Sequence, residues 1–574
     1  MTPIAAAELE ALALQCRDAA FRSDLSSSPV WDRVKQTIET SILTLDKAFG
    51  RGETATSEGA DASSTQCNEN GEDDDDGLSY TFTVGKGSAV DDVAERGLDA
   101  ASVHVTDVAV ALEAAEHLTS AFRFARNACA AAPSNQDVCR ELGLLRMARD
   151  LVAKCCVWCD IDEEKLQAAL ILLTQVALQF SVNAVTGRLM NQQHAWALFF
   201  PDTFQKLLVD CQEHRKIVAF SAALILNCVN GEWSDDNVDT RRVDLVCART
   251  LIITLLQRCL TQSNTGQQQV VDDHDPAFEW ICLLFRQLFE TGYSKELYNS
   301  VGAHLLSKLW SRVTPEQLIL LRMFTMWITS KRSSVRSPDE SESRSVSSLP
   351  SSLGDKEKRV KVEEFVKNTW VYIISQEEED RPEEADTTRR IMWMEFENEA
   401  KLMLLDVMGE LTLGAQLSDT TSESHAEELL ISLLEELGRV WSLRRLGPGV
   451  SKASGTSTPS EVVTAKEPFG YRSAIIRVVG NLCYRQTDHQ DIVREKGFLP
   501  LFLNHCNVDE MNPLLREWSL VALRNLCEGN EANQQYITAL RPQGIDKTSV
   551  DLDGLNVDAK LDADGKLKVS RKTD

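Results

Sequence analysis

Two segments near the end of the chain line up with one another at an offset of 44 residues. Ile476–Cys483 reads Ile-Arg-Val-Val-Gly-Asn-Leu-Cys, and Leu520–Cys527 reads Leu-Val-Ala-Leu-Arg-Asn-Leu-Cys. In each case a Gln follows nine positions after the Asn, and the same Asn, Cys and Gln spacing begins upstream at Asn127. A period in the low forties with helical patterning is typical of armadillo and HEAT repeats. The chain is therefore predicted to be a stack of helical repeats.

Apolar residues elsewhere follow the helical period of three and four rather than the alternation of a strand. Gly497 is expected to end one helix, and Asn512-Pro513 to begin the next as cap and first turn. The fold class is predicted to be all-α, an armadillo/HEAT-like right-handed α-solenoid of about ten repeats of roughly 40–47 residues each. The segments with this pattern are Trp31–Phe49, Leu166–Phe180, Ile217–Cys228, Val243–Leu260, Phe278–Phe289, Leu318–Ile328, Ile391–Leu413 and Ala426–Leu443.

Acidic and Ser-rich stretches interrupt this pattern. Glu53–Asp99 holds 13 acidic and two basic residues, and Lys331–Gly354 is rich in Ser. Such compositions bury too little apolar surface to offset the entropy of ordering, so we expect disordered insertions. The predicted organisation is an N-terminal helical cap (1–52), an acidic insertion (53–100), N-terminal repeats (101–330), a Ser-rich linker (331–356), middle repeats (357–446), a flexible loop (447–467), C-terminal repeats (468–541) and a disordered tail (542–574).

Charge and hydropathy limit the classes of partner. The net charge of -27 on 574 residues disfavours nucleic acid and anionic membrane surfaces, which both attract Lys and Arg. The most apolar helical stretch, Leu166–Leu178, is too short to span a bilayer, and the first residues do not resemble a signal peptide. We expect a soluble, cytoplasmic protein without membrane insertion or nucleic-acid binding. Self-association stays open.

The Ser-rich linker contains two candidate phosphorylation sites. Ser334 follows the basic pair Lys331-Arg332, which suits a basophilic kinase, and Ser337 precedes Pro338, which suits a proline-directed kinase. The alternative is a solvated linker without modification.

The residues of the C-terminal repeats resemble a known family. The stretch Tyr471–Ile537, with Gly-Asn-Leu-Cys-Tyr-Arg, Asn-Pro-Leu-Leu-Arg-Glu-Trp-Ser and Leu-Arg-Asn-Leu-Cys-Glu-Gly-Asn-Glu-Ala-Asn-Gln, is similar to the C-terminal homology domain of the ataxin-10 family. Phe122–Cys129 and Lys216–Ser221 resemble that family's N-terminal armadillo region. The resemblance implies a cytoplasmic armadillo-like scaffold without catalytic chemistry, implicated in cell division. Some fungal members carry a copper-transport name.

Asn127, Asn481 and Asn525 occupy one position of the repeat. In peptide-binding armadillo proteins, the equivalent Asn bonds the backbone of an extended ligand. The tryptophan that nuclear-import adaptors place four residues earlier is replaced here by Arg123, Arg477 and Val521. The alternative is that each Asn bonds a neighbouring repeat and holds the stack. A buried, bonded Asn costs roughly 1–3 kcal/mol when truncated.

Three further side chains are candidates for protein contacts. Arg126 and Arg524 stand beside the repeat Asn and would present charge to an acidic partner, or pair with nearby carboxylates. Trp518 would anchor a partner, or pack between helices.

The cysteines are interpreted mainly as packing residues. Cys129, Cys483 and Cys527 share one repeat position, too far apart in stacked helices to share a metal. Cys155–Cys159 contains a C-x-x-C without a second ligand pair, a weak metal or redox signal. Phosphate-loop, nucleophile-elbow and zincin motifs are absent, so no catalytic residue, metal ligand or cofactor site is predicted.

The leading hypothesis is a non-enzymatic cytoplasmic scaffold that binds protein partners, with cytokinesis as the process that the resemblance implies. The alternatives are an importin-like adaptor that grips basic peptides and a copper-homeostasis factor.

Overall fold

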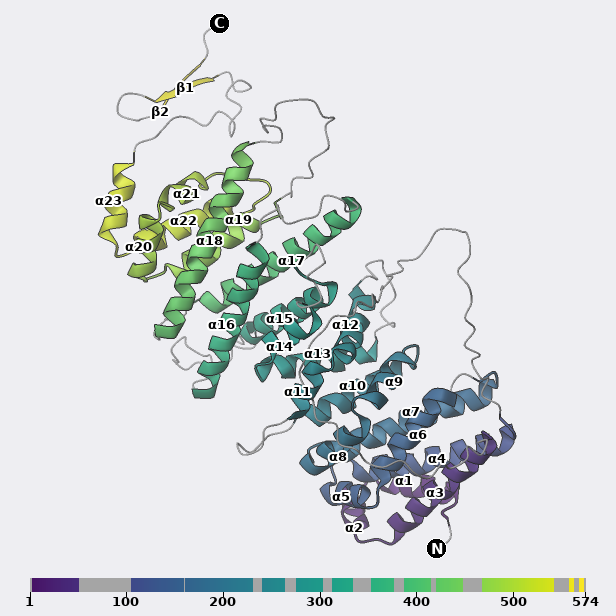
Figure 1. Cartoon of the computed structure of the whole chain (residues 1–574). Helices are drawn as coiled ribbons and strands as arrows, with labels where there is room; N and C mark the ends of the chain where they lie inside the picture. Colours follow the sequence, from purple (N-terminus) through teal and green to yellow (C-terminus); the bar gives the residue numbers. More distant parts are fainter. Residues whose placement is uncertain are drawn as a thin grey trace, which may run out of the picture. The chain divides into compact units, whose positions relative to one another are not determined.

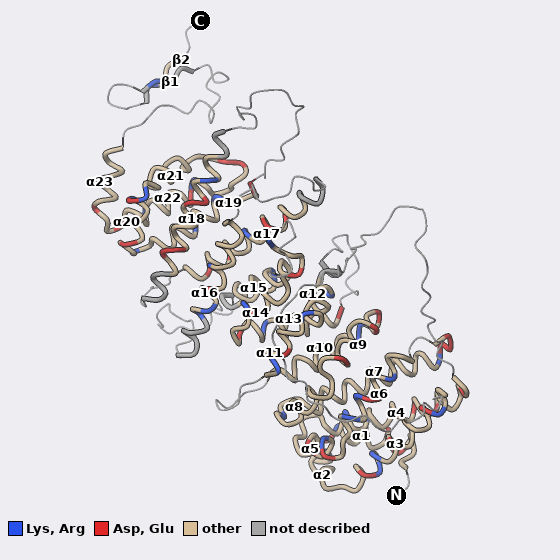
Figure 2. The backbone as a smooth tube through the Cα atoms, in the orientation of Figure 1, with Lys and Arg blue, Asp and Glu red and all other residues tan. Residues whose placement is uncertain are grey.

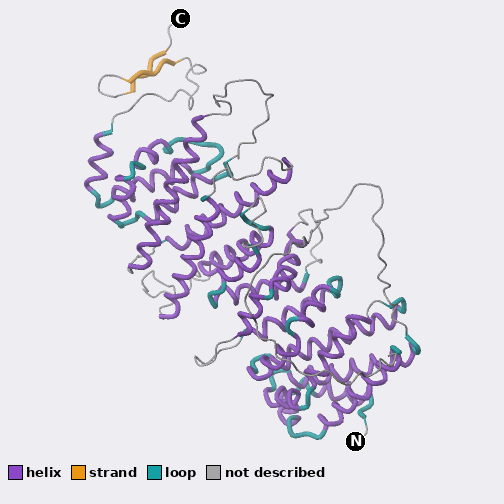
Figure 3. Tube along the Cα trace, viewed as in Figure 1, coloured by secondary structure: helices purple, strands orange, loops and turns teal. Residues whose placement is uncertain are grey.

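The computed structural model describes most of the predicted repeats. The residues described are 3–50, 105–158, 161–230, 240–263, 275–302, 312–333, 353–375, 387–413, 420–446, 467–540, 557–561 and 567–571. The predicted acidic insertion, the greater part of the Ser-rich linker, and most of the predicted loop at 447–467 lie outside these ranges. Within them the chain is helical apart from one short hairpin (Figure 3). The all-α solenoid class is confirmed, whereas the armadillo or HEAT type of the repeats and their right-handed superhelix stay predictions.

The chain divides into two compact units, Met1–Gly231 and Glu232–Asp574 (Figure 1). In the first unit, α1, α4, α7 and α10 contact one another in that order, and α3 packs on α4. The helices of this unit are α1 (Ala6–Gln15), α2 (Ala19–Leu25), α3 (Val30–Ala48), α4 (Val108–Cys129), α5 (Pro133–Glu141), α6 (Leu144–Trp158), α7 (Glu164–Val185), α8 (Leu189–Phe199), α9 (Asp202–Val209) and α10 (Arg215–Val229).

In the second unit, α12, α15, α17, α19 and α22 form the corresponding row of contacts. The helices α16 and α18 pack on α17 and α19 respectively, and on each other. The helices of this unit are α11 (Thr240–Cys247), α12 (Arg249–Ser263), α13 (Pro276–Glu290), α14 (Ser294–Val301), α15 (Pro315–Ser333), α16 (Leu353–Ile374), α17 (Thr387–Thr412), α18 (Thr420–Leu446), α19 (Tyr471–Leu482), α20 (Thr487–Glu495), α21 (Leu499–Asn504), α22 (Leu515–Cys527) and α23 (Glu531–Ala539).

The apolar stripes read from the sequence form the interior. On α3, the buried side chains include Trp31, Val34, Ile38 and Leu45, which are spaced at three, four and seven residues. This spacing puts them on one side of the helix, facing α4. Acidic and basic residues are interspersed along the described helices (Figure 2).

The helix α7 is longer than the sequence suggested. It runs for 22 residues, and by length and composition it could cross a membrane, so the expectation that this stretch is too short was wrong. It is also the central helix of the first unit, where it contacts α4, α6 and α10 and buries Leu170, Leu173 and Phe180. Packing between these helices accounts for its apolar composition.

Two helix boundaries differ from the prediction. The segment Val243–Leu260 is not one helix, because it is broken at Ala248 between α11 and α12. Asn512 does not begin α22, which starts at Leu515 after a left-handed Leu514. Instead, the Asn512 Oδ1 accepts from the backbone N–H of Arg472, at 2.8 Å, in the first turn of α19. A side chain from the later repeat therefore caps the helix of the earlier one. By contrast, Gly497 follows the end of α20 with a φ of 76°, as predicted.

The predicted disordered tail contains an antiparallel hairpin, β1 (Val557–Leu561) and β2 (Leu567–Arg571), with Ala559 opposite Val569. Its strands have only five residues each among many Asp and Lys, which is why no clear strand pattern is visible in the sequence.

Candidate functional site

The repeat asparagines bond from one helix of the row to the next. Asn525 Nδ2 on α22 donates to the backbone carbonyl of Gly480 on α19, at 2.9 Å. Asn481 on α19 donates to the carbonyl of Gly409 on α17, at 3.3 Å. Asn127 on α4 donates to the carbonyl of Ala13 on α1, at 3.0 Å. Each acceptor lies in the last turn of its helix, where carbonyls have no partner within the helix.

A fourth member of this set was missed. Asn183 on α7 donates to the carbonyl of Arg126 on α4, at 2.9 Å. Two signals could have found it: Gln192 follows it by nine positions, and Asn227 follows it by 44. In α10, however, Asn227 donates within its own helix, to the carbonyl of Ala223 at 2.9 Å.

The residue pair eight and nine positions after each Asn forms a second set of bonds. Asn533 Nδ2 donates to the carbonyls of Leu526, in its own repeat at 2.7 Å, and Gln490, in the previous repeat at 3.1 Å. Gln490 Nε2 donates to the carbonyl of Asn525, at 2.8 Å. In the first unit, Asn191 Nδ2 donates in the same way to the carbonyls of Ala184 and Gln136, both at 2.8 Å. The acceptors Leu526, Asn525 and Ala184 lie in the last turns of their helices, where carbonyls have no partner within the helix. The acceptors Gln490 and Gln136 lie inside the short helices α20 and α5. The recurring bonds to helix-end carbonyls explain the spacing found in the sequence.

We call the amides of these two sets the amide ladder: Asn127, Asn183, Asn481 and Asn525 with the following Asn135, Gln136, Asn191, Gln490 and Asn533. At the position equivalent to Asn533, the imidazole of His489 bonds the carbonyl of Leu482 at 2.8 Å. The geometry is that of the stacking alternative, since Asn525 is buried and its amide is engaged with the neighbouring helix. Binding of a peptide by these residues stays a prediction.

The other candidate residues lie in different surroundings. Arg126 is half-buried, and it donates from Nε to Asn127 Oδ1 at 3.0 Å and from a terminal nitrogen to Gln179. Burial, followed by the nearby charge of Arg123, lowers its pKa. Arg524 is exposed, and Trp518 is half-buried on α22.

Arg524 occupies a position that is a glycine in the previous repeat. Gly480 lies so close to α22 that an added Cβ would come within 3.2 Å of the Ala522 Cα and Cβ. A side chain at this position is compatible with the last helix of the row because, within the described residues, no further repeat helix packs there. A polar outer surface is typical of the final repeat of such arrays.

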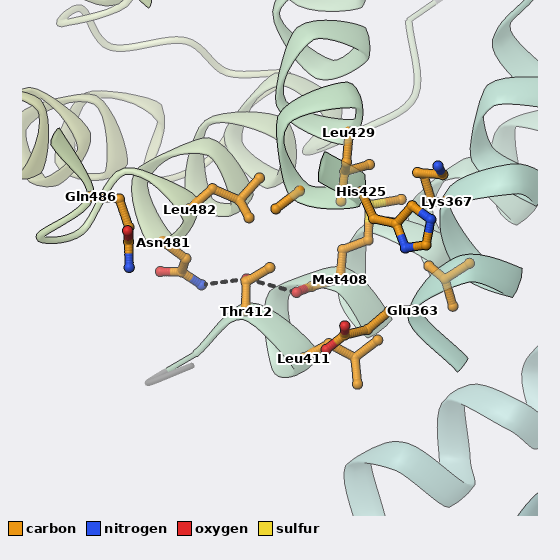
Figure 4. A pocket seen from close by; sticks show the side chains of 12 residues that line it. Glu363, Lys367, Met408, Leu411, Thr412, His425, Leu429, Asn481, Leu482 and Gln486 are labelled. Atoms are coloured by element: carbon orange, nitrogen blue, oxygen red, sulfur yellow. Dashed lines mark hydrogen bonds between the residues drawn. The ribbon is translucent and has the colours of Figure 1, made fainter. Parts of the chain in front are cut away.

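A pocket adjoins Asn481 (Figure 4). Its wall is apolar, and its polar groups come from both sides of the opening: Asn481 and Gln486 on one side, and Glu363, Lys367 and His425 on the other. Asn481 Nδ2 donates to Thr412 Oγ1 at 3.2 Å, which fixes the amide at the edge. The apolar lining residues are Val366, Met408, Leu411, Ala426, Leu429 and Leu482.

The cationic group of this pocket is already paired. Lys367 is buried, and its ammonium group forms an ion pair with the Glu428 carboxylate. The hydrogen bond from Lys367, and then its charge, lower the pKa of Glu428. With this charge neutralised, the pocket suits an apolar group better than an anion.

A buried ion network lies at the start of α19. The Arg472 side chain is 1% exposed and bonds both Asp509, at 2.8 Å, and Glu467, at 2.7 Å. Asn512, which caps α19, also donates to Glu467 at 2.9 Å. Together these contacts tie the start of α19 to the segment before α22.

The cysteines of the repeat position do not converge. Cys129 and Cys483 are buried and Cys527 is half-buried, on α4, at the end of α19 and on α22. Among the described residues, His, Cys, Asp and Glu form no group of three that could hold a metal ion. Cys159, Ser334 and Ser337 lie outside the described residues, so the C-x-x-C and both phosphorylation sites stay predictions.

The stacked helices and the amide ladder together define a helical-repeat protein. Comparison with known proteins narrows this class. The model of the Spinocerebellar ataxia type 10 protein domain matches residues 471–570. Ataxin-10 of Xenopus tropicalis is 25% identical over 446 residues, covering 78% of this chain and 79% of that protein. Human Ataxin-10 is 26% identical over 442 residues, covering 75% and 78%. The Ataxin-10 homolog of Dictyostelium discoideum is 38% identical over 99 residues, covering 17% and 16%. These matches support assignment of the chain to the ataxin-10 family.

Proposed function

We propose that this chain is a non-enzymatic, cytoplasmic scaffold that binds protein partners and acts in cell division. Membership of a helical protein-interaction family supports the scaffold role, and we assign no catalytic step to the chain. The process and the compartment rest on the family resemblance. The observation that carries the binding role is the apolar pocket beside Asn481.

The chemistry of this pocket suits a protein segment. Its lining takes up one apolar side chain, such as Leu, Met or Phe, whose burial contributes about 1.5–3 kcal/mol. The side chains of Asn481, Gln486 and Glu363 at its opening offer hydrogen bonds to the backbone on either side of that side chain. An apolar anchor in a pocket with a polar rim is the usual centre of a protein interface.

The test fills the pocket without removing a core contact. Ala426 lines the pocket and is 7% exposed, so Ala426→Phe places a ring in the space that the partner's side chain would occupy. His425→Ala alters only the opening. Leu520→Ser is the matched control, because it removes an exposed apolar side chain of the same unit that does not line the pocket.

Each full-length variant is compared with the wild-type chain by quantitative affinity purification, and any candidate partner is then purified and titrated. We expect Ala426→Phe to weaken binding of the same purified partner at least tenfold, about 1.4 kcal/mol, while Leu520→Ser leaves it unchanged. Equal affinity of all variants, with unchanged melting temperatures, would contradict a docking role for the pocket.

The cellular part of the proposal has its own test. Depletion of the chain is expected to delay the separation of daughter cells, and the wild-type chain to restore it. Normal division after complete depletion would contradict a role in cell division. Accumulation of a tagged chain in the nucleus would contradict the proposed cytoplasmic location.

A further inference from the structure

Two thiols that are distant in sequence meet in the first unit. Cys156 lies in the last turn of α6, and Cys211 follows the end of α9, 55 residues later. Their sulfur atoms are 3.5 Å apart. Cys211 is buried, with 1% exposure, whereas Cys156 is half-buried and therefore open to small solutes. The sequence drew attention to Cys156 only through the C-x-x-C that it forms with Cys159.

We propose that Cys156 and Cys211 form an oxidation site, at which a peroxide converts the two thiols into an intramolecular disulfide. The Cys156 thiolate attacks one oxygen of the peroxide, the O–O bond breaks, and a sulfenic acid and hydroxide form. The Cys211 sulfur then attacks the sulfenic sulfur, the S–O bond breaks, and water leaves. In sum, two thiols and one hydrogen peroxide give one disulfide and two waters.

The geometry requires little movement. A disulfide has an S–S bond of about 2.05 Å, so the two sulfurs approach by roughly 1.5 Å from their present contact. Side-chain rotation at the end of α6 and in the turn after α9 supplies this movement, because α6 and α9 already contact each other.

The same unit contains a natural control. Cys129 and Cys139 are also 3.5 Å apart, but both are fully buried. Burial, a hydrogen bond with Cys129 and the neighbouring Cys129 charge all raise the pKa of Cys139. This pair has the contact distance without the accessibility, so peroxide should leave it reduced in the folded chain.

A bond between Cys156 and Cys211 would enclose α7, α8 and α9 in one covalent loop. Closing such a loop restricts the unfolded chain and stabilises the folded one. The oxidised first unit is expected to melt at a higher temperature and to resist proteolysis between α6 and α9. This inference does not depend on the proposed scaffold function.

The test treats the reduced full-length chain with hydrogen peroxide, blocks the remaining thiols, and maps disulfide-linked peptides by mass spectrometry. We expect the Cys156–Cys211 peptide pair as the main product, reversed by dithiothreitol, with Cys129 and Cys139 still free. Cys156→Ser, at the half-buried position, should abolish the linked pair and the rise in melting temperature while leaving the reduced protein folded.

Three results would overturn the proposal. They are a Cys156–Cys159 disulfide as the main product, equal oxidation of Cys129 and Cys139, and absence of any linked peptide after Cys156 has been consumed. Cys211→Ala provides a second check, because Cys156 should then stop at the sulfenic or sulfinic stage.

Discussion

The side-chain amide of Asn525 donates to the backbone carbonyl of Gly480, 45 residues earlier in the chain, at 2.9 Å. Gly480 immediately precedes Asn481, which makes the equivalent bond to the carbonyl of Gly409. In α17 and in α19, a carbonyl of the last turn therefore accepts a hydrogen bond from the Asn side chain of the next helix in the row. The repeated Asn holds neighbouring helices in register, and four testable consequences follow from this and related contacts.

The amide ladder should contribute measurably to stability. Asn183→Ala leaves the Arg126 carbonyl without its partner, and we expect it to destabilise the first unit by about 1–3 kcal/mol. Asn227→Ala is the matched control in the same unit, because the Asn227 amide donates within its own helix and alanine favours a helix. Its one bond to the neighbouring repeat is exposed and long, 3.4 Å from Thr186 Oγ1 to Asn227 Oδ1. The cost of this substitution should stay below about 0.5 kcal/mol. Urea unfolding, together with hydrogen exchange of α4 and α7, measures both. Equal losses would show that the bond between helices has no special role.

The close approach at Gly480 should not tolerate a side chain. Gly480→Leu would force α19 and α22 apart, because the nearest atoms belong to the backbone and Cβ of Ala522, and we expect a loss of at least about 1–3 kcal/mol. Arg524→Leu puts the same residue at the equivalent exposed position and should change stability by less than about 0.5 kcal/mol. Thermal melts of the two variants compare their losses of stability. A stable Gly480→Leu chain with unchanged hydrogen exchange in α22 would contradict it.

The buried ion network should show strong coupling. Arg472→Met leaves the Asp509 carboxylate, whose side chain is 3% exposed, without its cation, and we expect a loss of about 3–5 kcal/mol. The double variant Arg472→Met, Asp509→Leu removes both charges and should recover part of this loss. A double-mutant cycle from denaturant unfolding gives the coupling energy. Additive effects of the two substitutions would rule out a coupled pair.

Buried thiols should make the protein less stable at alkaline pH. Burial raises the pKa of Cys16 to about 11 and that of Cys259 to about 12, from an ordinary value of 9.0. The unfolded chain loses these protons first as pH rises above about 9, so the free energy of unfolding falls by up to ~1.4 kcal/mol per pH unit for each thiol until its folded pKa is reached.

The comparison that isolates this effect uses Cys16→Ala and Cys259→Ala, one in each unit. Each variant should have a shallower fall in urea midpoint between pH 9 and 11 than the wild-type chain, whatever its stability at pH 7. Parallel slopes for all three chains would exclude these thiols as the cause.

The helical class and the position of the ladder could be predicted because both depend on local patterns. Apolar residues that recur every three or four positions predicted the helix α3, and the spacing of Asn481, Gln490 and Asn525 predicted the repeat. In the structure this spacing has a physical cause, since the Asn and the Gln satisfy helix-end carbonyls in adjacent repeats.

Contacts between distant segments could not be predicted in the same way. Asn512 has the sequence signature of a cap, but the helix that it caps is α19 rather than the one that follows it. The pairing of Cys156 with Cys211 and the pocket around Asn481 also depend on which helices pack together. A local pattern predicts which residue makes a contact, whereas the packing of the helices determines which residue is its partner.

The cap on α19 also sets an order of events during synthesis. Both ends of this helix are completed by residues made later: its first turn by Asn512, 40 residues on, and its last turn by Asn525. A ribosome that adds about 5–20 residues per second needs roughly 2–8 s for those 40 residues. Throughout that interval the nascent α19 has neither its cap nor the neighbour that covers Gly480. A chaperone or an early partner would find this helix open only while the chain is being made.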